Sequence, residues 1–275
     1  MKSRSERLPP HDSVNDAVVA AFERRAARAE KLAEKSSVAR APLEFAAGLF
    51  RAQGALAAAV IDAQRSRPLS GQLADDLGAF AGALTGVLDF AATHGPPLLR
   101  DLASARRAED PRARLSTFWR QGGSGREDYL SRALLRPYAE VLISCGVTPS
   151  RPAATGGCPA CKGLPGIAWR ATEAQSDGAQ SFLGCALCGH EWPIGRIRCA
   201  CCSEEDPSKL AAFQSDRHPT VRVETCVTCR AYVKSIDLTI DARAVPEVDE
   251  LLSLSMDVWA ADQGYVRFEP GLAGI

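Results

Sequence analysis

Apolar residues recur every three or four positions through most of the first 150 residues, which places them on one face of a helix. Ser70 is the expected N-cap of the third apolar stripe, and Gly95 with the two prolines after it should end that stripe. Pro137 falls inside the last segment, where we expect it to kink or interrupt the helix. The pattern predicts a helix bundle over residues 14–33, 45–63, 73–91, 98–106 and 130–145.

The pattern changes at residues 148–157, where proline, glycine and small polar residues are typical of a linker. A helical stripe returns after Pro246, with Val248, Leu251 and Val258 expected on its buried face. Between the linker and this stripe, short apolar runs are separated by turn residues, which indicates strands. The expected strands cover residues 167–169, 181–183, 209–213, 221–223 and 232–238.

Eight of the ten cysteines form four Cys-x-x-Cys pairs, and the last two pairs repeat the first two with an offset of 41 residues. One such turn places two thiolates at two corners of a tetrahedron, and a second turn returned by a hairpin supplies the other two. Neighbouring pairs should share a metal, although interleaved pairing with long crossings is an alternative. We therefore predict two four-thiolate sites, formed by Cys158, Cys161, Cys185 and Cys188, and by Cys199, Cys202, Cys226 and Cys229.

Three neighbours of these pairs are open to interpretation. Cys201 adds a third thiol to the third pair, but only Cys202 keeps both the pair spacing and the offset, so Cys201 is interpreted as a bystander. It could also exchange with Cys202 or act as an exposed redox thiol. His190 follows a pair whose site four cysteines already fill, so we do not expect it to be a ligand. Gly163 and Gly189 are expected to adopt positive φ, which would point backbone N–H groups at the sulfurs.

The charge balance argues against nucleic acid and membrane partners. The formal net charge is zero, and residues 157–243 carry ten basic and ten acidic side chains. No apolar segment typical of a secretory signal follows the N-terminal residues, and the longest apolar run, 55–61, is too short to span a bilayer. We therefore expect a cytoplasmic protein, in which clustered cysteines bind metal rather than form disulfides.

The residues around the four pairs are more specific than those of a generic zinc ribbon. Acidic, basic and aromatic side chains flank the pairs at fixed positions, namely Glu191, Trp192, Arg196, Glu224, Tyr232 and Lys234. This order resembles the bacterial formate dehydrogenase accessory proteins, the FdhE family, over residues 158–234. Trp192 is expected to pack on its ribbon, with docking of a partner as the alternative.

The resemblance implies a cytoplasmic accessory protein, not an enzyme, that binds the catalytic subunit of a respiratory formate dehydrogenase during maturation. It implies that the eight paired cysteines are ligands of rubredoxin-type iron, for which zinc is also a plausible occupant. Iron held by four thiolates can carry one electron, which would add a redox role. Two other functions compete with this one: a zinc-ribbon nucleic-acid binder, and a thiol–disulfide enzyme, for which the βαβ context is absent.

The sequence therefore predicts an α+β protein with an N-terminal all-α domain over residues 1–150. Two tandem rubredoxin-like or zinc-ribbon modules should follow, over residues 151–196 and 197–243. A C-terminal helix and tail should complete the chain over residues 244–275.

Overall fold

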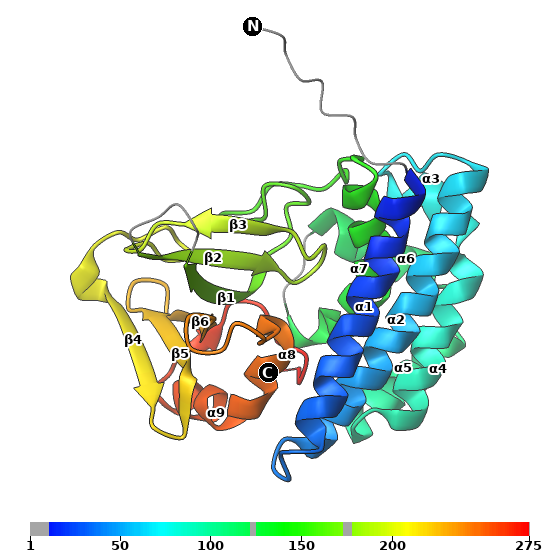
Figure 1. Cartoon of the computed structure of the whole chain (residues 1–275). Coiled ribbons are helices and arrows are strands. Elements are labelled where there is room, and N and C mark those ends of the chain that lie inside the picture. Colours follow the sequence, from blue (N-terminus) through cyan, green and yellow to red (C-terminus); the bar gives the residue numbers. More distant parts are fainter. Residues whose placement is uncertain (1–10, 122–124, 173–177, 275) are drawn as a thin grey trace, which may run out of the picture.

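A computed structural model describes residues 11–121, 125–172 and 178–274 of the chain, and it confirms the α+β class (Figure 1). Helices form one half of the molecule, and a mixed sheet with two four-cysteine clusters forms the other. The helices are α1 (His11–Ala33), α2 (Arg40–Ser66), α3 (Leu73–Asp76), α4 (Leu84–His94), α5 (Pro97–Arg107), α6 (Pro111–Gln121) and α7 (Tyr129–Ser144).

Helix α2 is the central element of the helical half and packs against α1, α4 and α7. Its residues Leu43, Phe50 and Val60 are completely buried in the same core as Phe22 of α1. In the described part of the chain, α2 is the one helix long and apolar enough to cross a membrane by length and composition. However, 56% of that stretch is buried in the protein, as expected for the core helix of a bundle.

The third apolar stripe is not one continuous helix, although its apolar residues are buried as predicted. Two 3₁₀ turns lie between α3 and α4, and Gln72 rather than Ser70 is the N-cap of α3. The buried Asp76 carboxylate accepts hydrogen bonds from the backbone N–H of Ser70 and Gly71, at 3.0 and 2.9 Å, and from the Tyr138 hydroxyl at 2.6 Å. These bonds fold the Ser70 segment back onto α3, so the N-cap falls at Gln72 and not at Ser70.

Pro137 does not interrupt α7, which runs through it as one helix. A proline removes the N–H that would bond to the carbonyl four residues earlier, here that of Ala133. The Nε2 of Gln53, on α2, donates to this carbonyl at 2.8 Å in the buried core. A side chain from the neighbouring helix therefore replaces the missing backbone donor.

The seven strands of the described residues belong to one sheet, in the order β3-β2-β1-β6-β5-β4, with β7 paired to β6. The predicted modules are joined because β1 and β6 pair in parallel, which the sequence did not indicate. The two unpredicted strands are β3, an edge strand that contains Pro193, and the short β7. The strands are β1 (Pro165–Thr172), β2 (Ala179–Cys185), β3 (Glu191–Ile194), β4 (Leu210–Ser215), β5 (His218–Cys226), β6 (Ala231–Asp237) and β7 (Val266–Arg267).

The C-terminal helix is divided into α8 (Pro246–Asp249), a 3₁₀ turn (Glu250–Ser253) and α9 (Leu254–Asp262). The completely buried Lys234 of β6 donates to the Glu250 carbonyl at 2.8 Å and to the Asp257 carboxylate at 2.6 Å. The turn changes the helical phase, so Met256 faces the sheet while Val258 is 57% exposed. The prediction that Val258 is buried was therefore wrong.

We predict that Gln53→Leu destabilises the protein by about 1–3 kcal/mol, because it leaves the Ala133 carbonyl without a donor. In a Pro137→Ala background, the restored backbone N–H can bond to this carbonyl, and the same substitution should cost less. Denaturant unfolding of the four proteins in this double-mutant cycle measures the difference. An equal cost in both backgrounds would contradict the replacement of the donor.

Candidate metal centres

The first cluster of cysteines lies where the β1–β2–β3 part of the sheet meets the helical half. Cys158 and Cys161 come from the turn before β1, Cys185 ends β2, and Cys188 lies in the turn to β3. The Sγ atoms of Cys158 and Cys188 are 3.8 Å apart, and those of Cys161 and Cys185 are 3.4 Å apart. All four sulfurs lie within 4.8 Å of one another.

The second cluster repeats this arrangement in the β4–β5–β6 part of the sheet. Cys199 and Cys202 come from the turn before β4, Cys226 ends β5, and Cys229 lies in the turn to β6. The Sγ–Sγ distances are 3.7 Å between Cys199 and Cys229 and 3.7 Å between Cys202 and Cys226. The cysteines thus group as neighbouring pairs along the chain and not as interleaved ones.

The sulfur geometry fits a tetrahedral metal site. Zinc–sulfur bonds of about 2.3 Å place the sulfurs of a regular tetrahedron about 3.8 Å apart. These four Sγ–Sγ separations, 3.4 to 3.8 Å, lie close to this value and far above the roughly 2.05 Å of a disulfide bond. Four thiolates around one ion are a donor set that suits zinc and iron.

The same backbone conformation recurs at all four Cys-x-x-Cys turns. The residue after each second cysteine has a positive φ between 58° and 66°, and its N–H bonds to the carbonyl of the first cysteine of its pair. These residues are Lys162, Gly189, Ser203 and Arg230. The prediction was correct for Gly189 but wrong for Gly163, because the conformation belongs to the position directly after the pair.

Backbone N–H groups of the turns point at the sulfurs. Gly163 donates to the Cys161 sulfur at 3.3 Å and Leu187 to the Cys185 sulfur at 3.4 Å, and Cys201 donates to the Cys199 sulfur at 3.4 Å. Such bonds stabilise thiolate charge and orient the ligands. The Gly163 backbone lies so close to the sulfurs that a side chain would be crowded: an added Cβ would lie 3.2 Å from each of the sulfurs of Cys161 and Cys185.

The two clusters differ in their surroundings. The first is part of the main hydrophobic core, whereas Cys202 and Cys229 of the second are partly exposed. Arg151 stacks over Trp119, with 4.8 Å between its guanidinium and the ring centroid, and the thiols of the first cluster lie close enough to act on its pKa. Burial lowers the pKa of Arg151, and the cysteine charges oppose that effect. A divalent ion with four thiolates carries two negative charges, which this buried cation would partly offset.

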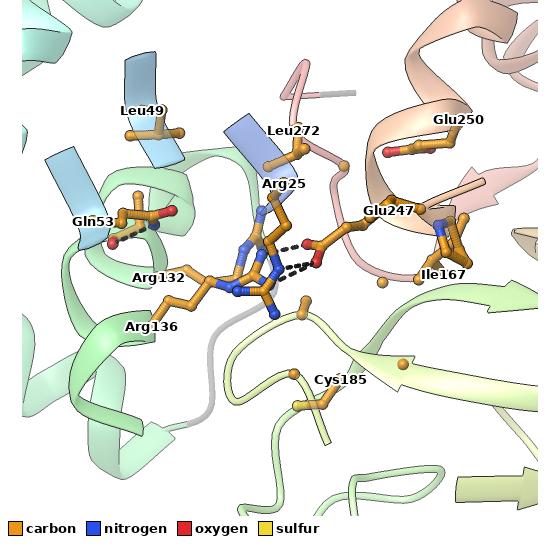
Figure 2. A pocket seen from close by; sticks show the side chains of 18 of the residues that line it. Arg25, Leu49, Gln53, Arg132, Arg136, Ile167, Cys185, Glu247, Glu250 and Leu272 are labelled. Carbon is orange, nitrogen blue, oxygen red and sulfur yellow. Dashed lines mark hydrogen bonds and ion pairs between the residues drawn. The ribbon is translucent and has the colours of Figure 1, made fainter. Parts of the chain in front are cut away.

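A cavity of about 270 Å³ lies beside the first cluster and is lined by residues of the helices, the sheet and the C-terminal segment, among them Cys185 (Figure 2). Figure 2 shows Arg25 of α1 and Arg136 of α7 converging on Glu247 of α8, with ion-pair distances of 2.6 Å. Burial alone would raise the pKa of Glu247, but the two guanidinium charges outweigh it and lower that pKa to about 2. These ion pairs connect α1 and α7 of the helical half to α8, at the cavity that Cys185 of the first cluster also lines.

Four other residues discussed in the sequence analysis, Trp192, His190, Tyr232 and Lys234, have structural partners. Trp192 is partly buried against the core, and its ring lies alongside that of His190. His190 belongs to neither sulfur cluster, but its backbone carbonyl accepts a hydrogen bond from the Cys185 N–H. The hydroxyl of the buried Tyr232 donates to the Asp257 carboxylate at 2.9 Å. Tyr232 and Lys234 thus attach α9 to β6, a role that the sequence motif did not indicate.

The chain is similar to known proteins both in sequence and in fold. Residues 197–272 match the family model described as FdhE, C-terminal domain. The protein FdhE homolog of Aquifex aeolicus is 32% identical over 117 residues, which cover 42% of this chain and 41% of that protein. The homolog of Pseudomonas putida is 30% identical over 149 residues, or 52% of this chain and 46% of that protein. These matches span less than half of the relatives' lengths.

The fold similarity extends over nearly the whole chain. The crystal structure of the FdhE protein from Pseudomonas aeruginosa superposes with a TM-score of 0.64 and covers 97% of each chain, at 24% sequence identity. The FdhE homologs and the C-terminal domain match are similarities over part of the chain, and the shared fold agrees with them. The chain is therefore similar to FdhE proteins, in sequence over part of its length and in fold over nearly all of it.

Proposed function

We propose that the chain is a non-enzymatic assembly factor that binds the immature catalytic subunit of a formate dehydrogenase. The binding unit is the pair of four-cysteine modules, residues 151–196 and 197–243. The observation that carries the proposal is the pair of tetrahedral sulfur clusters in a chain that is similar to FdhE proteins. Because four thiolates complete a tetrahedral site, neither metal keeps an open position for a substrate, which favours a binding role over catalysis.

The eight clustered cysteines are the proposed ligands, and each cluster holds one iron or zinc ion. Metal–thiolate bonds would supply much of the folding free energy of the modules, on the order of 10 kcal/mol per site. Iron in this environment would add the ability to carry one electron and so to respond to the redox state of the client. Eight cysteine ligands remain reduced only in a reducing compartment, so we propose that the protein is cytoplasmic.

We predict that anaerobically purified protein contains two metal equivalents per chain, one for each cluster. A chelator should remove the metal of the more exposed second centre in a separate, faster phase. Cys158 and Cys161 have no exposed surface and Cys185 and Cys188 only 4% and 5%, so the first centre is protected. Elemental analysis during chelation measures both quantities. Substantially fewer than two equivalents in folded protein, or loss of both in one phase, would contradict this prediction.

Cys201 should be dispensable for metal binding, because its sulfur is outside the second cluster. The variant Cys201→Ser should keep both metal equivalents, whereas Cys202→Ser should lose about one. The two serines differ by a single position, so the comparison separates ligand loss from a general effect on the turn. Retention of metal by the second variant and loss by the first would exchange the roles of the two thiols.

The client should bind only when the metal centres are intact, because without metal the thiolates repel one another and the hairpins fray. Tagged protein from cells grown on formate or nitrate should capture the catalytic subunit. A Cys185→Ser/Cys188→Ser variant should capture much less of it. The matched control is Cys145→Ser/Cys201→Ser, which removes two thiols outside the clusters. Equal capture by both double variants would refute the requirement for metal.

A further inference from the structure

The two faces of the sheet are different. On one face, Trp169, Val223 and Ile236 pack against Met256 and Ala260 of α9. The opposite face is hollowed into a groove of about 290 Å³ that extends from β2 and β3 to β4 and β5. Cys199, Cys201 and Cys226 line one part of this groove, so it borders the second metal centre.

Positive charge gathers in this groove. Its four lining arginines are Arg170 and Arg222 on the sheet and Arg196 and Arg198 in the loop before the second cluster. Arg170 and Arg222 share one carboxylate oxygen of Asp237, at 3.6 Å each, and neither guanidinium group donates a hydrogen bond to any described residue. Each of the two guanidiniums therefore has donors left for an incoming anion.

The loop arginines add to this positive charge, and only one of the residues that line the groove is acidic. Arg196 is exposed and has no ion-pair partner in the described part of the chain, and Arg198 pairs only with the exposed Glu205. Glu224 is the single acidic side chain among the residues that line the groove. The balance of charges over residues 157–243 thus conceals a local excess of cations.

Strand β4, whose Leu210–Ala212 line the groove, is the last strand of the sheet and has one unpaired edge. Edge strands are usually protected by charged residues, proline or a covering element. The β4 sequence, Leu-Ala-Ala-Phe-Gln-Ser, has no charge and no proline, and most of its residues are exposed. An extended peptide can add to such an edge through main-chain hydrogen bonds.

We propose that the β4 edge and the adjoining groove bind an extended acidic segment of the client subunit as an additional strand. The inference rests on the proposed function and specifies its contact site. The main chain of the segment pairs with β4, and its carboxylates reach the groove arginines. Apolar side chains such as Ile194 and the 51% exposed Ile197 favour a peptide over a phosphate backbone.

The test uses a fluorescein-labelled, capped hexapeptide that alternates glutamate and valine, and fluorescence anisotropy with the full metal-loaded chain. Arg196→Glu/Arg198→Glu should weaken binding about tenfold or more, because reversed charges repel the peptide. The matched control, Arg217→Glu/Arg243→Glu, makes the same charge change at exposed positions outside the groove and should have a much smaller effect. A peptide that alternates lysine and valine should bind weakly.

Hydrogen exchange locates the peptide, since amides of residues 210–215 should become protected when it binds. Equal losses of affinity in the two double variants, protection elsewhere on the chain, or tighter binding of a thymidine oligonucleotide than of the glutamate peptide would each overturn the proposal.

Capture of the catalytic subunit separates this proposal from the proposed function. Wild-type chain and the Arg217→Glu/Arg243→Glu control should capture it, and the groove variant should capture much less. Equal capture by the two variants refutes the groove alone. A wild-type chain that captures no catalytic subunit refutes the proposed function, while the peptide measurements still decide on the groove.

Discussion

The enclosed first sulfur cluster is the constraint on which the rest of the structure depends. Its four cysteines come from two turns and belong to the same hydrophobic core as the helices, so the sheet and the helical half meet around it. Without a cation, four thiolates that all lie within 4.8 Å of one another would repel strongly. A bound metal would remove that repulsion and fix both turns. The ion pairs of Arg25 and Arg136 with Glu247 then hold the C-terminal segment beside it.

The internal repeat therefore produces two centres with one geometry and different surroundings. Each uses the same turn, with a residue in the left-handed conformation directly after its second cysteine. The first centre is enclosed by the helical half, whereas the second borders an open groove next to an unprotected edge strand. This difference agrees with a division of roles in which the first centre stabilises the fold and the second adjoins the groove that we propose as a binding surface.

Local patterns in the sequence predicted most of the elements and the composition of both clusters, because helical periodicity and the Cys-x-x-Cys spacing are local properties. Contacts between distant residues were not predictable in this way. Gln53 completes α7 at Pro137 from another helix, Lys234 binds the turn before α9, and β1 pairs with β6 across the two modules. The ten basic and ten acidic residues of the modules gave no sign of the groove, because composition does not specify where charges lie in space.

The most direct test of the account is X-ray absorption spectroscopy of the purified protein at the edge of its bound metal. With two ions each held by four of the eight cysteines, we predict a first shell of four sulfur atoms around each metal, at about 2.3 Å for zinc. No second metal should lie at a short distance from the first. A shell that contains nitrogen or oxygen in place of sulfur, or a short metal–metal distance typical of a cluster, would contradict the account.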